Sequence, residues 1–135
     1  MAGLPVPVRD VRVRIQSVGA CGPFARITVD FEPPGAAGAA EFRNTVPEED
    51  LPAEYLHALW VGLQGGLDGV AALVTLTQGR HHEVDSSEYG FKLAGEMAGR
   101  AARVGAGLLP PEEAERLTKV SWPGKPGSTE PTTAG

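Results

Sequence analysis

Two adjacent histidines, an arginine and a lone cysteine are the side chains whose types and spacing point to chemistry. Arg80, His81 and His82 are consecutive, and guanidinium and imidazole groups can meet phosphates or stack on bases. Cys21 is the only cysteine of the chain. Beside a histidine it would form a Cys–His pair or a partial zinc site. That set lacks a fourth ligand and a third, orienting group, so a thiol or metal enzyme is not favoured.

A helix is expected directly after this polar cluster. The Asp85 side chain can accept a hydrogen bond from the backbone N–H of Glu88, whose carboxylate can reach back, as in a capping box. Ser86 and Ser87 complete this expected cap, so structural capping is the simplest interpretation of the acidic and hydroxyl residues here. The apolar residues that follow recur at helical spacing: Phe91, Ala94, Ala98 and Ala101. Between them, Gly90, Gly95 and Gly99 keep the helix surface flat, which predicts close approach of a sheet.

Alternating patterns predict the strands that must carry the cluster. The first pattern, from residue 11, turns Val11, Val13 and Ile15 to one face. In the second, the inward residues are Ala25, Ile27, Val29 and Phe31. A third, shorter strand has one face marked by Phe42, Asn44 and Val46. The segment 70–77 is apolar on both faces, as in a covered strand, and Gln78-Gly79 is interpreted as the turn that ends it.

Four arginines lie on the outward faces of these strands: Arg12, Arg14, Arg26 and Arg43. Because Asp30 and Glu41 lie nearby in the sequence, we interpret this surface as a solvated sheet face. An RNA platform is the alternative.

The first helix is predicted to begin near Asp50, a suitable N-cap, with Pro52 in the first turn. Around it the chain divides into a flexible lead-in (1–7), one domain (8–109), a short helix within 110–121 and a disordered tail (122–135). The element order is β-β-β-α-β-α. We therefore predict an α+β fold, a two-layer α/β sandwich with a four-stranded sheet and helices on one face.

Composition limits the classes of function. A chain of 135 residues with a net charge of −5 is not expected to bind nucleic acid non-specifically over a broad surface. No apolar run of spanning or signal length occurs, so we expect a cytoplasmic protein without a membrane partner. The Gly-x-x-x-x-Gly-Lys-Ser/Thr phosphate loop is also missing. We therefore expect no cofactor, no metal and no GTP binding by this chain.

Residues 82–94 read His-Glu-Val-Asp-Ser-Ser-Glu-Tyr-Gly-Phe-Lys-Leu-Ala. This run resembles the His-Asp-Val-Asp-Ser-Ser-Glu-x-Ala-Phe-Lys-Leu-Ala segment of domain IV of translation elongation factor G. Weaker similarities extend over about residues 8–109, among them Val29-Asp30-Phe31-Glu32-Pro33 and Pro52-Ala53-Glu54-Tyr55. The resemblance implies the same element order, with a left-handed crossover.

The resemblance also implies a function, that of a non-catalytic translation module which reaches the ribosomal decoding region by transfer-RNA mimicry. Two loops at one end of the sheet would form its RNA-binding tip: Gly19, Ala20, Cys21 and Gly22 in the first, and Gly79, Arg80, His81, His82 and Asp85 in the second. The ribosome, or ribosomal or transfer RNA, is the partner that this implies.

One loop departs from the family pattern. The first tip loop of the family reads Gly-Gly-Arg-Gly-Gln, whereas residues 19–23 read Gly-Ala-Cys-Gly-Pro. The arginine and glutamine are absent, which weakens the expectation of RNA contact at that loop. The alternative is a protein-interaction or regulatory module that kept the fold, lost the RNA contacts and binds a separate protein partner.

Overall fold

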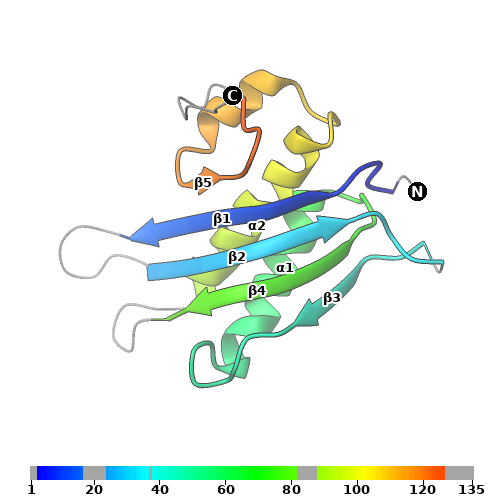
Figure 1. Ribbon diagram of the computed structural model, residues 1–135. Coiled ribbons are helices and arrows are strands. Elements are labelled where there is room, and N and C mark those ends of the chain that lie inside the picture. Colours follow the sequence, from blue (N-terminus) through cyan, green and yellow to red (C-terminus); the bar gives the residue numbers. More distant parts are fainter. Residues whose placement is uncertain (1–2, 17–23, 37, 82–87, 127–135) are drawn as a thin grey trace.

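The computed structural model describes residues 3–16, 24–36, 38–81 and 88–126. Within these ranges one mixed sheet forms a layer, and the two long helices lie together on one of its faces (Figure 1). The opposite face of the sheet carries no helix in the described part of the chain. The prediction of an α+β fold with helices on one face is confirmed.

The sheet has five strands in the order β3-β4-β2-β1-β5. The strands are β1 (Val8–Gln16), β2 (Phe24–Glu32), β3 (Glu41–Asn44), β4 (Leu73–Arg80) and β5 (Val120–Ser121). The helices are α1 (Ala53–Leu67), α2 (Glu88–Gly105) and the short 3-10 helix η1 (Pro111–Arg116). Neighbouring strands run antiparallel except β3 and β4, which are parallel. The predicted sheet of four strands is wrong, because β5 adds a fifth beside β1.

The predicted inward faces of the first two strands form the core. Their side chains are at most 5% exposed: Val11, Val13, Ile15, Ala25, Ile27, Val29 and Phe31. From the other layer, Leu59, Leu63 and Phe91 are fully buried. Alternation predicted these faces well because each strand has one face against the helices and one face open, which gives a period of two.

More of the two end segments packs against the core than the sequence predicted. Within the expected lead-in, Leu4 is 2% exposed and its N–H donates to the Ala71 carbonyl at 2.8 Å. Segment 110–121 contains η1 and then β5, beyond the short helix expected there. Trp122, at the start of the expected disordered tail, is 7% exposed and belongs to the core. Residues 127–135 lie outside the described ranges. A two-residue strand and one buried indole have no periodicity for sequence analysis to detect.

Lys125 closes the C-terminal segment onto itself. Its Nζ donates to the Leu117 carbonyl at 2.8 Å and to the Val120 carbonyl at 2.7 Å, and burial lowers the pKa of this ammonium group. We expect Lys125→Met, which keeps the stem but removes both bonds, to lower the free energy of unfolding by about 1–2 kcal/mol. Urea denaturation would measure it. Lys119→Met is the matched control, since the structure describes no side-chain hydrogen bond for Lys119, and an equal loss there would contradict the assignment.

Helix α1 begins later than predicted. Its first residue is Ala53 and its N-cap is Pro52, which has no side-chain cap bond. Asp50 instead lies in a turn, where its N–H and that of Leu51 both donate to the Pro47 carbonyl. The Asp50 N-cap prediction is therefore wrong. Leu51, fully buried, draws this turn onto the core.

The two helices touch through glycines. Gly62 and Gly66 of α1 face the backbone of α2 at Lys92 and Glu96, where an added Cβ would overlap a carbonyl oxygen. On α2, a Cβ at Gly95 would lie 2.5 Å from the Leu59 carbonyl oxygen. Sequence analysis assigned Gly95 and Gly99 to contact with the sheet, and this is wrong, because both face the backbone of α1. The glycines let α1 approach to backbone contact.

Candidate functional site

Strand β4 extends through the residues that were predicted to form a turn. Thr28 pairs with Gln78 and Val29 with Leu76, so Thr77 is an extra residue in β4 and forms a bulge. Its hydroxyl donates to the Thr28 carbonyl at 3.1 Å. The Gln78-Gly79 turn is therefore wrong, and the strand continues to Arg80.

The bulge decides which way Arg80 faces. Val74 and Leu76 are fully buried under the helices, and strict alternation would send residue 80 inward with them. The extra residue reverses the phase, so that Gly79 faces inward and Arg80 is exposed on the open face. A Cβ at Gly79 would lie 3.0 Å from Leu51 Cδ2, which shows how closely the buried turn before α1 approaches.

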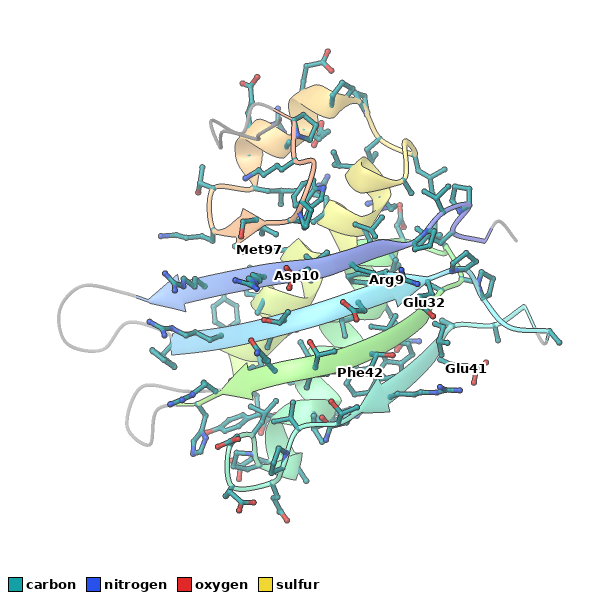
Figure 2. The ribbon with its side chains drawn as sticks, in the orientation of Figure 1. Arg9, Asp10, Glu32, Glu41, Phe42 and Met97 are labelled. Atoms are coloured by element: carbon teal, nitrogen blue, oxygen red, sulfur yellow. The ribbon has the colours of Figure 1, made fainter. Side chains whose placement is uncertain are left out.

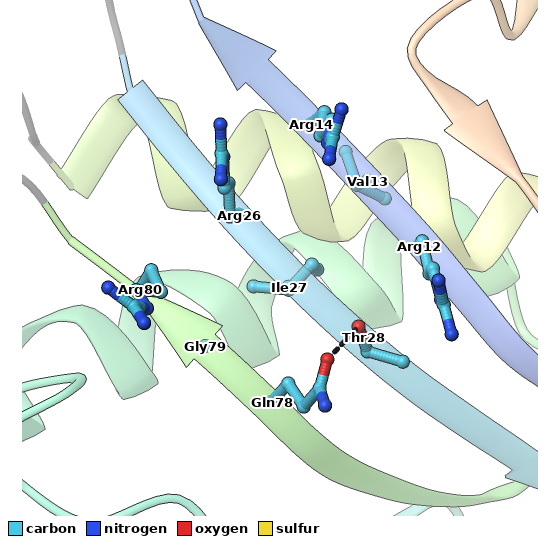
Figure 3. Close-up of a pocket in the computed structure, with 9 residues that line it drawn as sticks. All are labelled: Arg12, Val13, Arg14, Arg26, Ile27, Thr28, Gln78, Gly79 and Arg80. Carbon is cyan, nitrogen blue, oxygen red and sulfur yellow. Dashed lines mark hydrogen bonds between the residues drawn. The ribbon is translucent and has the colours of Figure 1, made fainter.

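Three arginines form a row across the open face of the sheet. Arg14 of β1 is directly opposite Arg26 of β2, and Arg26 is directly opposite Arg80 of β4. We call Arg14, Arg26 and Arg80 the arginine row. Figure 3 shows the three side chains at one end of the sheet, with Arg12 farther back along β1.

The arginine row borders a shallow hollow of about 210 Å³. At one side of the hollow, the Thr28 hydroxyl donates to Gln78 Oε1 at 3.1 Å (Figure 3). Arg12 also lines it, and its guanidinium is paired with Asp10 (Nε–Oδ1 3.2 Å). The hollow thus combines guanidinium groups with a neutral polar pair, a set that suits a polyanion with further hydrogen-bonding groups.

Acidic residues collect at the other end of the same face. Arg9 pairs with Glu32 at 2.7 Å, and the Asp10 N–H donates to Asp30 Oδ1 at 2.8 Å. These contacts form at a second bulge, in β1, where Asp10 has a φ of 60°. Figure 2 shows Arg9, Glu32 and Glu41 near the end of the sheet opposite to the arginine row.

This separation revises the interpretation of the outward arginines. Asp30 is four residues from Arg26 on β2, about 13 Å along the strand, and Glu41 is level with the first residue of β4, Leu73. The two acids therefore do not dilute the charge of the arginine row. Arg43 belongs to the exposed edge strand β3 and lies outside the row.

His81 is held against the helical layer. Its Nδ1 donates to the Asp50 carbonyl at 2.9 Å, and its ring centroid lies 6.0 Å from that of Tyr55. Tyr55 in turn stacks on Phe91 at 4.8 Å. Burial, and then the carboxylates of Glu54 and Glu88, raise the pKa of Tyr55. These contacts fix the orientation of the imidazole and leave Nε2 as its other polar atom.

The predicted site residues divide into two groups. Gly79, Arg80 and His81 are described at the end of β4, and Glu88 is the first described residue of α2. The others lie outside the described residues, and their roles stay predictions: Gly19, Ala20, Cys21, Gly22, His82, Asp85, Ser86 and Ser87. Sequence reasoning missed the alignment of Arg14 and Arg26 with Arg80. The alternation in the sequence predicted the face of the sheet on which Arg14 and Arg26 lie. Only the pairing register of the strands shows that they align with Arg80.

Within the described ranges, no group of three or more His, Cys, Asp or Glu side chains is arranged to hold a metal ion. No helix in these ranges has the length and apolar character needed to cross a membrane.

Comparison with known proteins gives two findings. The sequence model of the family described as elongation factor G, domain IV matches residues 7–107. A crystal structure from Thermus thermophilus resembles this chain with a TM-score of 0.62 and 18% sequence identity. The likeness covers 72% of this chain and 16% of that one, so this chain corresponds to a small part of that protein. At this identity the structural likeness concerns the fold.

Proposed function

The chain belongs to the elongation factor G domain IV family, and from this membership we propose that it is a non-catalytic, translation-related module that contacts the ribosome through a loop tip. The match to residues 7–107 carries the proposal. The partner would be ribosomal or transfer RNA near the decoding region, approached by mimicry of a transfer RNA.

The ends of the strands support a tip at one end of the sheet. Gln16, the last residue of β1, is opposite Phe24, the first of β2. Two residues further along β2, Arg26 is opposite Arg80, the last residue of β4. The chain therefore leaves β1 and β4, and enters β2, at a single end of the sheet (Figure 1).

We assign the tip contacts to two segments. The first is Gly19, Ala20, Cys21 and Gly22, and the second runs from Gly79 to Asp85. Arg80 and His82 would donate to phosphates or base edges, whereas Asp85, Ser86, Ser87 and Glu88 would cap α2. This sequence has no phosphate loop, so we assign no GTP binding to it.

Co-sedimentation with purified ribosomes tests the proposal. We expect the intact protein to pellet with ribosomes, and the double variant Arg80→Ala/His82→Ala to bind at least about 5-fold more weakly, because it loses polar contacts. The matched control is Arg43→Ala/His57→Ala, which removes the same residue types from exposed positions on β3 and α1.

Two outcomes would contradict this function. Equal weakening by both double variants would indicate a charge effect without a tip contact. Absence of co-sedimentation would favour the alternative, a protein-interaction or regulatory module. The missing arginine and glutamine in residues 19–23 favour that alternative, because the first loop then lacks strong donors to RNA.

A further inference from the structure

We propose that the open face of the sheet is itself a binding surface for single-stranded RNA, whose phosphate backbone lies along the arginine row. This goes beyond the proposed function, because the surface is built from β1, β2 and β4 and shares only Arg80 with the assigned tip segments. It also does not require a ribosome.

The register of the strands carries the inference. Arg14, Arg26 and Arg80 occupy consecutive cross-strand positions, which brings three guanidinium groups to one end of the open face. The row spans two strand spacings, about 10 Å. A chain of phosphates placed across the strands would pass all three guanidinium groups, and a guanidinium fork can donate two hydrogen bonds to a phosphate.

The basic surface continues beyond β1. The N–H of Arg14 donates to the Lys119 carbonyl at 3.0 Å, so Lys119 lies next to the row in the segment that leads into β5. A second hollow, of about 490 Å³, is lined by Arg12, Arg14 and Lys119. The two hollows share Arg12 and Arg14. A strand of RNA could therefore pass from Arg80 across β2 and β1 towards Lys119.

An aromatic side chain makes RNA a better occupant than an acidic peptide. Phe24 is two residues before Arg26 on β2, so the two side chains belong to the same face of the sheet. The Phe24 ring centroid lies 5.6 Å from the Arg26 guanidinium carbon. Open sheets that bind single-stranded RNA combine aromatic stacking with basic groups. A polycarboxylate would gain little from the ring.

The charge balance of the chain sharpens the expectation. The net charge is −5, so the protein as a whole repels a polyanion. Binding must then come from the few guanidinium groups concentrated at this end of the sheet. We expect affinity to depend steeply on salt and on the individual arginines, without a general electrostatic background.

Fluorescence anisotropy with a labelled oligouridylate is the test. We expect binding by the intact protein, and a loss of at least about 10-fold in affinity for Arg14→Ala/Arg26→Ala. Loss of two phosphate contacts should also reduce the slope of log K against log salt by about 1.4. Arg9→Ala/Arg43→Ala is the matched control, since it removes the same charge from the same sheet outside the row. Circular dichroism would check that both variants are folded.

A third variant separates the two kinds of occupant. Phe24→Leu keeps an apolar side chain but loses the ring, and should weaken oligouridylate binding about 5-fold or more. Polyglutamate should not displace the RNA. The proposal fails if the intact protein does not bind oligouridylate, if both arginine pairs weaken binding equally, or if polyglutamate competes and Phe24→Leu has no effect. RNA binding without ribosome co-sedimentation would defeat the ribosome proposal and leave this one standing.

Discussion

Gly62→Ala should lower the free energy of unfolding by about 3 kcal/mol or more, although it adds a single methyl group to a helix. The new Cβ would overlap the Lys92 carbonyl oxygen, which is backbone and has no rotamer into which it can move. The helices would have to move apart. The close backbone contacts of Gly66 with Glu96 and of Gly95 with Leu59 would then also be lost. Overpacking a tight core costs about 1–3 kcal/mol, and this site is at the upper end because both sides are main chain.

Gly65 supplies the matched control in the same helix. A Cβ there would lie 3.9 Å from the Glu96 side chain, which is ordinary contact. Gly65→Ala should therefore stabilise α1 by about 0.5–1 kcal/mol through helix propensity alone. Urea midpoints of the two variants should move in opposite directions. If Gly62→Ala were as stable as Gly65→Ala, the helices would not be in backbone contact.

Trp122→Ala should cost about 3–5 kcal/mol, the range for removing a buried aromatic side chain. The indole is 7% exposed. A Cβ at Gly105, the end of α2, would lie 3.2 Å from its Nε1, and the Lys125 ammonium lies 5.6 Å from its ring centroid. Its removal would leave a cavity between α2 and the C-terminal segment, and would free β5 from the edge of β1.

Trp122→Phe is the control, because it keeps a ring in the cavity and should lose much less stability. The chain has two tryptophans, so Trp60→Phe leaves Trp122 as the single tryptophan reporter. Its emission should shift to the red in the same urea transition as the loss of helical circular dichroism. An earlier, separate shift would mean that the C-terminal segment is not part of the cooperative fold.

Prediction from sequence succeeded where a regular spacing of apolar residues marks one buried face of an element. The inward faces of β1 and β2 followed from alternation, because each residue there has a simple choice between helices and solvent. It failed where a single extra residue changes the phase. The bulges at Asp10 and Thr77 depend on what lies across the strand, including the Asp30 side chain and the Thr28 carbonyl. Neither partner is adjacent in the sequence.

The same limit applies to the candidate site. Arg80 was identified from its place beside two histidines, but its direction depends on the Thr77 bulge. Arg14 and Arg26 were placed on the outward face, yet their alignment with Arg80 requires the register of three strands. The acids expected to neutralise them are close in the chain and distant on the sheet. Nearness in the sequence therefore did not mean nearness to the arginine row, and the interpretation as a solvated sheet face stays a prediction.

The position of β5 also bears on how the protein behaves at high concentration. The long strands β1, β2 and β4 are all interior to the sheet, and the outermost strands, β3 and β5, are four and two residues long. Long unpaired edges are templates on which sheets of different molecules join. The short C-terminal strand pairs with Arg12 and Val13 of β1 and so reduces the free main chain at that border. The segment that adds a strand to the fold thus also protects the molecule against growth into aggregates.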